Sequence, residues 1–278
     1  MVKNETVDNY PTHCNEDFLD SEVILQAGGR GQRIQPLSDL QPKPLLPVCG
    51  MPMIEILFRQ IVSAGFRKIT VITGYGKDAL VEHIESILKL LPHDVRVRFH
   101  HEDRPQGNLG ALGDIDTGLR SALLLFADLV TDLDFVQLLR VHREKGCNIT
   151  LTSHYERYRL RLGEICVTGE RVTDYQEKPA KEFLACSGII VFEPEVVKLA
   201  REIPKPFGLS DLVQVALGRG HSVAHWAHGA FWHDVNTEDE LREAESKLME
   251  LQNRKGTMGL FESPRVLWRL FGLSNTGR

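Results

Sequence analysis

A glycine-rich stretch near the N-terminus constrains this chain most. From Val23 to Val48 the sequence reads VILQAGGRGQRIQPLSDLQPKPLLPV, with a short apolar run directly before Ala27 and two glycines. Such a run is typical of a buried strand that enters a loop. Glycines let backbone N–H groups approach a phosphate closely, and Arg33 and Lys43 follow as cations that can contact the same phosphates. The stretch therefore predicts a phosphate-binding loop.

Two common phosphate-binding motifs fit this loop badly. A Walker A motif requires Gly-Lys-Ser/Thr, which does not occur here. A dinucleotide-binding fingerprint requires a third glycine that opens a helix, but Ile34 and then Pro36 follow instead. A NAD-dependent oxidoreductase is therefore the least favoured alternative.

The stretch resembles the signature of the sugar-1-phosphate nucleotidyltransferases, LAGGxGTRLxPLT followed by PKPLLPV. The matching positions are Gly28, Gly29, Gly31, Arg33, Pro36, Leu37, Lys43 and Pro47, and the departures are Gln26, Gln32 and Ile34. The resemblance implies that Arg33 and Lys43 are catalytic cations. It also implies a nucleotide site at Gln26, Ala27, Gly28, Gly29, Arg30 and Gly31.

Composition excludes several other classes of protein. The 278 residues are 42% hydrophobic and carry a net charge of -5, which disfavours general binding to nucleic acid or anionic lipid. We expect no membrane-spanning run and no signal peptide, and the five scattered cysteines do not form a zinc motif. These features favour a cytoplasmic enzyme with reduced thiols.

Strand and helix patterns alternate after the glycine loop. Residues 51–64 and 78–90 have helical periodicity, whereas 68–73 and 95–100 are β-branched or alternating. This order predicts a Rossmann-like α/β fold with a mainly parallel twisted sheet flanked by helices. The family resemblance adds a small β sugar-binding insertion, and the periodic patterns at 238–254 and 261–273 predict a C-terminal helical extension. We divide the chain into a flexible arm at 1–20, a catalytic domain at 21–242 and the extension at 243–278.

A second block, EDRPQGNLGAL from Glu102 to Leu112, resembles the segment that frames the nucleotide base in the family. It adds Glu102, Pro105, Gly107 and Asn108 to the predicted nucleotide site. Glu102 can accept hydrogen bonds from N–H groups of guanine, and a purely structural role is the alternative. Taken alone, the block fits an ordinary loop before a helix equally well.

Two aspartates are the predicted metal ligands. Asp128 follows the apolar strand 123–126, and Asp234 lies in GAFWHDV, where the family carries its second metal carboxylate. Mg²⁺ prefers carboxylate, phosphate and water oxygens. A turn or helix N-cap is the alternative for Asp128, and it suits Asp132 and Asp134 better because a helical pattern follows them.

The sugar-phosphate site rests on resemblance alone. Gln176-Glu177-Lys178-Pro179 matches a family motif whose Glu binds sugar hydroxyls and whose Lys contacts the sugar phosphate. The other members of the predicted site are Gly163 and Ser187. A surface Glu-Lys pair before a proline is the alternative for Glu177 and Lys178.

These motifs together predict transfer of a nucleoside monophosphate from an NTP to a sugar 1-phosphate. The resemblance favours GTP and implies Mg²⁺ as cofactor. Thymidylyl, uridylyl and cytidylyl transfer remain open, as does a non-catalytic subunit that only binds a sugar nucleotide. The apolar pattern at 261–273 predicts either a homo-oligomer contact through the C-terminal extension or a docked helix.

Overall fold

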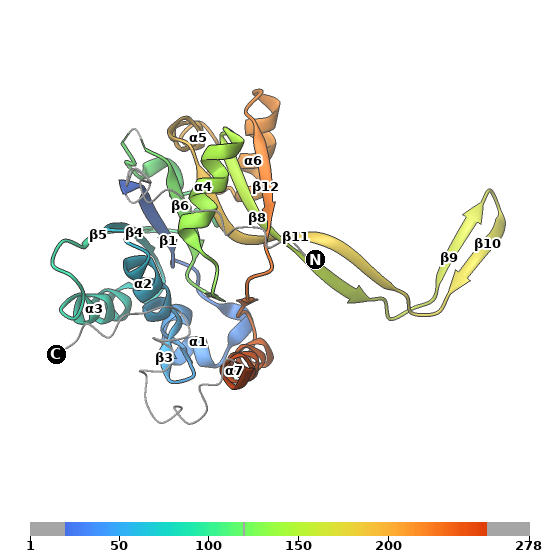
Figure 1. Cartoon of the computed structure of the whole chain (residues 1–278), viewed down its shortest axis with the longest axis horizontal. Helices are drawn as coiled ribbons and strands as arrows, with labels where there is room; N and C mark the ends of the chain where they lie inside the picture. The colour runs from blue at the N-terminus through green and yellow to red at the C-terminus, as the bar shows by residue number, and fades with distance from the viewer. Residues whose placement is uncertain (1–19, 119, 255–278) are drawn as a thin grey trace, which may run out of the picture.

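The computed structural model describes residues 20–118 and 120–254, and its centre is a seven-stranded sheet in the order β12-β8-β11-β6-β1-β4-β5 (Figure 1). Strands β1 (Glu22–Gln26), β4 (Lys68–Thr73), β5 (Arg96–His101) and β6 (Ala122–Phe126) are parallel neighbours. Strand β11 (Ala180–Phe192) is antiparallel to β6 and to β8 (Ile149–Arg159), and β12 (Val223–Ala227) is parallel to β8. The predicted mainly parallel sheet is confirmed.

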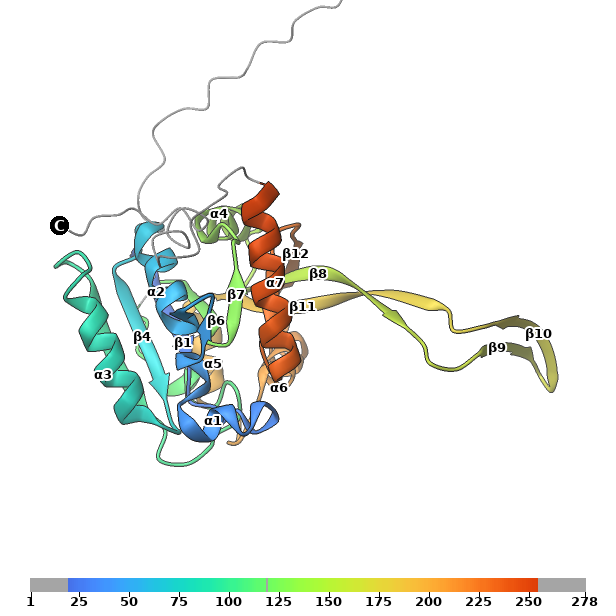
Figure 2. The same ribbon diagram turned by 90° about the horizontal axis from the view of Figure 1, so that it is seen from below.

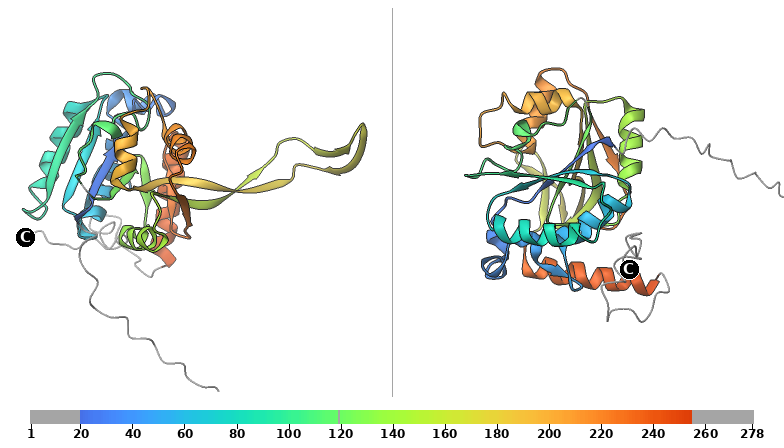
Figure 3. Two further views of the ribbon diagram at one scale, coloured as in Figure 1. Left: turned by 90° about the horizontal axis from the view of Figure 1, so that it is seen from above. Right: turned by 90° about the vertical axis from the view of Figure 1, so that its left-hand side faces the viewer.

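Helices cover both faces of this sheet, as the end-on view in Figure 3 shows. Helices α2 (Met53–Ser63), α3 (Lys77–Leu88) and α4 (Phe135–Lys145) pack on one face with the apolar residues of β1 and β4. Helices α5 (Pro194–Ala200) and α6 (Leu209–Gly218) pack on the other face with the short helix η4 (Leu112–Asp114). Because side chains alternate along a strand, the buried strands feed both cores.

A third apolar cluster lies below the glycine-rich stretch. The stretch continues through η2 (Gln32–Ile34), α1 (Leu37–Leu40), η3 (Lys43–Leu45), β2 (Pro47–Val48) and β3 (Met51–Pro52). Helix α7 (Glu238–Arg254) packs Ala244 and Leu248 against this region, and β7 (Leu129–Thr131) pairs with β13 (Trp232–Asp234) beside it. Helix α7 therefore packs directly against the glycine-rich stretch.

Two long strands leave the body of the molecule as a ribbon. Strands β8 and β11 stay paired from Cys186 and Ser153 out to Ala180 and Arg159, and the hairpin β9 (Glu164–Thr168) and β10 (Arg171–Gln176) forms the tip (Figures 1 and 2). We call residues 154–186 the arm. The small β insertion that the family resemblance implies is present as this hairpin, whereas the extension of β8 to Arg159 was not predicted. The outer part of β8 is exposed and mixes Tyr155 and Tyr158 with charged residues, so no alternating apolar pattern indicates it.

The predicted domain boundaries remain predictions. The expected boundary between 242 and 243 falls inside α7, which is one continuous helix. The N-terminal segment 1–20, apart from its last residue, and the apolar segment 261–273 lie outside the described residues. Across residues 20–118 and 120–254, no helix combines the length and apolar character needed to cross a membrane.

Candidate functional site

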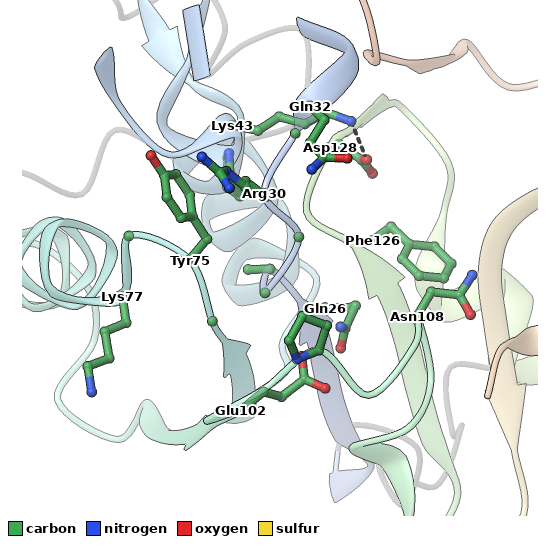
Figure 4. A pocket seen from close by; sticks show the side chains of 18 of the residues that line it. Gln26, Arg30, Gln32, Lys43, Tyr75, Lys77, Glu102, Asn108, Phe126 and Asp128 are labelled. Atoms are coloured by element: carbon green, nitrogen blue, oxygen red, sulfur yellow. Dashed lines mark hydrogen bonds and ion pairs between the residues drawn. The ribbon is translucent and has the colours of Figure 1, made fainter. Parts of the chain in front are cut away.

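The main cavity lies at the carboxyl ends of the parallel strands, where ligands bind in open α/β sheets. Its volume is about 1060 Å³, and it is lined by the loops after β1, β4, β5 and β6 (Figure 4). Thirteen predicted site residues line it: Gln26, Ala27, Gly28, Gly29, Arg30, Gly31, Arg33, Lys43, Glu102, Pro105, Gly107, Asn108 and Asp128. The fold thus brings the first two sequence blocks together around one cavity.

Close backbone packing shapes the floor of this cavity. A Cβ on Gly28 would lie 2.6 Å from Oε2 of Glu102, so any side chain there would displace the carboxylate. Gln26 and Glu102 point into the cavity in Figure 4. Burial raises the pKa of Glu102, although a hydrogen bond from the Gln26 side chain opposes the shift. Among the described residues, Oε1 of Gln26 and Oε1 of Glu102 are buried without a hydrogen-bond partner.

Cations and carboxylates form a network at the other end of the cavity. Nζ of Lys43 donates to Oδ2 of Asp128 at 2.6 Å and to Oδ1 of Asn236 at 2.7 Å. Nη2 of Arg33 donates to the same Asn236 oxygen at 2.6 Å, and Nδ2 of Asn236 donates to Asp234. Lys43 is only 7% exposed, and burial of this kind strengthens each charged contact. The network brings all four predicted catalytic and metal residues together through Asn236.

Asp234 is the most perturbed carboxyl of this network. Burial, together with the negative charge of Asp128, raises its pKa to about 6, against the opposing effects of Lys43 and Asn236. Its Oδ1 atom is buried and has no partner within the described part of the chain. A buried carboxylate oxygen that has no partner and lies near a second carboxylate is suited to binding a cation.

The donor set fits Mg²⁺ only if a phosphate completes it. Within residues 20–118 and 120–254, no group of three or more His, Cys, Asp or Glu side chains is arranged to hold a metal. Mg²⁺ characteristically binds one or two carboxylates and substrate phosphates while it keeps several waters. Asp128 and Asp234 therefore match a metal that arrives with a triphosphate.

The predicted sugar-phosphate residues lie away from the cavity. Ser187 is fully buried at the root of the arm, where its hydroxyl contacts His154 and His228, each at 2.8 Å. Gly163, Glu177 and Lys178 lie further out on the arm, and the side chains of Glu177 and Lys178 are 62% and 58% exposed. These assignments stay predictions, since no ligand contact tests them.

Several lining residues were not predicted from the sequence. Asn236 was not among the predicted site residues, although it connects Arg33, Lys43 and Asp234. Tyr75, in the loop after β4, and Lys77, the first residue of α3, also line the cavity, and the Arg30 guanidinium lies 5.4 Å from the centre of the Tyr75 ring. The available signal was the predicted strand that ends at Thr73, because neighbouring parallel strands end at one edge of the sheet.

Known proteins share the motifs and the fold of this chain. A family model described as "Nucleotidyl transferase" matches residues 22–250. A Mycobacterium tuberculosis protein named mannose-1-phosphate guanylyltransferase is 26% identical over 237 residues, which cover 79% of this chain and 62% of that protein. A Sulfolobus acidocaldarius relative is 28% identical over 242 residues, covering 84% of this chain and 65% of its own length. The chain thus spans less than two thirds of both relatives.

Solved structures share the fold. HddC from Yersinia pseudotuberculosis complexed with GMP-PN superposes with a TM-score of 0.61 at 18% identity, over 82% of this chain and 99% of that one. The family model covers the sheet, the cavity and most of α7, and the relatives include guanylyl- and uridylyltransferases of sugar 1-phosphates. The chain belongs to the sugar-1-phosphate nucleotidyltransferase family.

Proposed function

We propose that this protein transfers a guanylyl group from GTP to a sugar 1-phosphate and releases pyrophosphate. The observation that carries the proposal is the network of Arg33, Lys43, Asp128 and Asp234 at the end of a glycine-lined cavity. Two cations and two carboxylates within one network suit a reaction between phosphates, in which negative charge must be held and moved.

The proposed reaction is a single in-line displacement. An oxygen of the sugar phosphate forms a bond to the α-phosphorus of GTP, and the bond between the α-phosphorus and the bridging oxygen of pyrophosphate breaks. Arg33 and the glycine-rich loop hold the triphosphate, and Lys43 contacts the reacting phosphate. Orientation of the two phosphates provides much of the acceleration, and no covalent enzyme intermediate is required.

Asp128 and Asp234 are the proposed Mg²⁺ ligands. When bound, the metal neutralises charge on the phosphate oxygens as pyrophosphate departs. Lys43 donates to Asp128 at 2.6 Å, which places its ammonium group where it would also contact the reacting phosphate. Asn236 keeps Arg33 and Asp234 in place throughout.

The cavity floor supports guanine as the base. Gln26 and Glu102 each present a buried oxygen that has no partner among the described residues. Guanine carries neighbouring donors, N1–H and the 2-amino group, on one edge, whereas uracil and thymine carry a single N–H between two carbonyl oxygens. A pair of unpaired acceptors is best satisfied by a pair of donors, since a buried acceptor left unsatisfied costs about 1–3 kcal/mol.

A second candidate is a subunit that binds a sugar nucleotide without turnover. It is favoured by the position of Glu177 and Lys178, which lie on the arm outside the cavity. It offers no reason for the chain to keep Arg33, Lys43, Asp128 and Asp234 in one network, so catalysis is preferred.

Pyrophosphate release tests the proposal. The protein is assayed with Mg²⁺, each common nucleoside triphosphate, and a panel of sugar 1-phosphates that includes mannose and heptose types. We expect release with GTP and one acceptor class. Preference for another triphosphate would contradict the guanine assignment but keep the reaction. Binding of a sugar nucleotide in calorimetry without any release would favour the non-catalytic subunit.

A further inference from the structure

The arm carries predicted sugar-phosphate residues away from the cavity of its own chain. Its root lies beside the cavity, because a Cβ on Gly188 would be only 3.0 Å from the ring of Phe126, which lines the cavity. From Ser187 to Ala180 strand β11 covers up to about 23 Å at roughly 3.3 Å per residue, and Lys178 lies two residues beyond the end of the strand. The paired strands β8 and β11 therefore place the tip of the arm away from the body of its own chain (Figure 1).

The tip hairpin has one apolar face that nothing in the described part of its own chain covers. Val167 pairs with Val172 and Ile165 pairs with Tyr175, so these four side chains lie on the same face. Each is 55–60% exposed. The opposite face is polar and includes the pair of Cys166 and Asp174. An antiparallel sheet with one apolar face normally packs that face against a core, and an isolated two-stranded ribbon is marginal in water.

Further exposed apolar side chains occur towards the root of the arm, on both faces of the ribbon: Tyr155 pairs with Leu184 on one face, and Tyr158 and Phe183 lie on the other. With Leu162 and the four side chains of the hairpin, the arm carries most of the large exposed hydrophobic side chains of the described residues. A patch of this kind marks a protein contact rather than a free surface.

Two residues of the predicted sugar-phosphate site lie against the same tyrosine of the arm. The hydroxyl of Tyr175 donates to Oε2 of Glu177 at 2.6 Å, which fixes the carboxylate. Gly163 lies against the same ring, since a Cβ there would be 2.2 Å from the Tyr175 oxygen. Gly163 and Glu177, which the sequence assigns to one site, are therefore assembled together on the arm.

We propose that two copies of this chain exchange their arms, so that the hairpin of one copy covers the cavity of the other and supplies Glu177 and Lys178 to its sugar phosphate. A second copy is the occupant that the geometry favours, because it carries the phosphate site that these polar residues would complete. Since the arm leaves from the edge of its own cavity, a two-fold axis near the root directs each arm across the other cavity. Reciprocal exchange of identical elements closes at a dimer.

The roles of Glu177 and Lys178 in this inference rest on the proposed function, whereas the exchange rests on the arm itself. Light scattering after size-exclusion chromatography should give about twice the 31.4 kDa chain mass. The double change Ile165→Lys and Val172→Lys on the apolar face should yield monomers. The matched change Cys166→Lys and Thr168→Lys on the polar face should leave dimers. A monomeric wild type, or equal behaviour of both variants, would overturn the proposal.

Complementation tests whether the arm acts in the other copy. Asp128→Asn disables the cavity, Lys178→Ala disables the arm, and each change alone should lower turnover at least tenfold. When the variants are co-refolded, each mixed dimer contains one intact composite site. Random mixing should therefore restore about one quarter of wild-type turnover, because half the dimers are mixed and one of their two sites is intact. Mixed dimers that form, as seen by native mass spectrometry, but show no recovery would refute exchange.

A cross-linking experiment separates failure of the exchange from failure of the proposed function. A photo-reactive residue at position 175 is placed in dimers co-refolded from ¹⁴N- and ¹⁵N-labelled chains. Exchange predicts cross-linked peptides that include mixed labels, with partner peptides from the cavity region around Phe126. Same-label peptides alone would overturn the inference. Mixed-label peptides from a protein that releases no pyrophosphate would keep the exchange and reject the function.

Discussion

At the scale of single residues, Asn236 links the charged groups of the network. It accepts from Arg33 and Lys43 and donates to Asp234, so one amide sets the positions of two cations and one carboxylate. Its donated hydrogen bond favours the charged form of Asp234 and lowers that pKa. A positioning residue of this kind acts through its neighbours.

We expect Asn236→Ala to lower kcat/KM by about 10- to 100-fold, which corresponds to the loss of hydrogen bonds to charged groups. Because the variant removes a bond that lowers the pKa of Asp234, the acidic limb of the kcat/KM profile should move to higher pH. Steady-state assays between pH 5 and 9 measure both effects. A lower rate with an unmoved acidic limb would show that Asn236 acts on Arg33 and Lys43 but not on Asp234.

Glu102 determines the base if its carboxylate accepts from guanine. Glu102→Gln keeps the shape of the side chain but replaces one acceptor oxygen with an NH₂ group, which would face the N–H donors of guanine. We therefore expect kcat/KM with GTP to fall about 10- to 100-fold. Activity with UTP should change less. Asp103→Asn is the matched control, because Asp103 lines the same cavity with a 99% exposed side chain. An equal loss of kcat/KM with GTP in Glu102→Gln and Asp103→Asn would show that Glu102 does not select the base.

Asp234 should destabilise the ligand-free protein near neutral pH. Its pKa is about 6 in the folded protein, against an ordinary value of 3.8, so the unfolded chain binds fewer protons between pH 4 and 6. The contribution of Asp234 to the free energy of unfolding is therefore fully present below pH 4 and is lost as the pH rises through 6. After a discount for solvent screening, Asp234→Asn should raise stability at pH 7 by about 1 kcal/mol, or roughly 2–4 °C in Tm.

Thermal unfolding without Mg²⁺ measures this difference. The two Tm values should converge as the pH falls below 3.8, because Asp234 then becomes neutral in the unfolded chain as well as in the folded protein. A variant that is less stable than wild type at pH 7 would contradict the burial argument. We also expect turnover to be lost, because the amide cannot replace the carboxylate at the proposed Mg²⁺ site.

At the scale of elements, local patterns in the sequence predicted the central strands and helices but not the extension of β8 into the arm. The glycine stretch predicted a buried strand and the cavity loop, because apolar residues and glycines leave a local pattern. Beyond His154 the residues of β8 are exposed, and pairing with β11 is what keeps this outer half extended. Pairing between distant segments leaves no periodicity in either segment. The contacts of Asn236 were hidden for the same reason, since they span 193 and 203 positions.

Helix α7 stabilises the site from below. Glu240 accepts from the backbone N–H groups of Asn236 and Thr237, at 2.7 and 2.9 Å, and fixes the turn that carries Asn236. One helical turn further, Ala244 and then Leu248 enter the third apolar cluster. The helix thus connects the stability of that cluster to the position of the network.

Leu248→Ala should lower the free energy of unfolding by about 2–5 kcal/mol, because the Leu248 side chain is only 1% exposed and its removal leaves a cavity. Met249→Ala is the matched control on the neighbouring position, where the side chain is 42% exposed, and it should change stability by less than about 0.5 kcal/mol. Urea unfolding of both variants measures the difference. Similar losses would indicate that α7 does not pack through Leu248.

At the scale of the whole molecule, the structure separates into a body and an arm. The three apolar clusters contain no residue of the arm beyond its root, so the body does not depend on the hairpin for its core. The glycine loop and the cation–carboxylate network belong to the body, and the predicted sugar-phosphate residues Gly163, Glu177 and Lys178 belong to the arm. Binding of the two substrates is therefore expected to be separable.

Replacing residues 160–179 by Asn-Gly tests this separation. Arg159 and Ala180 are a cross-strand pair, so a two-residue turn joins β8 to β11 without a change of register. We expect cooperative unfolding and GTP affinity within about threefold of wild type, because every residue that lines the cavity is retained. Turnover with the best sugar 1-phosphate should fall at least about 100-fold, since the acceptor loses its positioning groups.

Calorimetry with GTP and the pyrophosphate assay measure the two quantities on one preparation. The double change Cys166→Lys and Thr168→Lys is the control, because it alters the polar face of the hairpin and keeps its length. Loss of GTP binding in the shortened protein would mean that the arm also forms the nucleotide site. Retained turnover would mean that the acceptor binds to the body alone, in which case Glu177 and Lys178 have no part in the reaction.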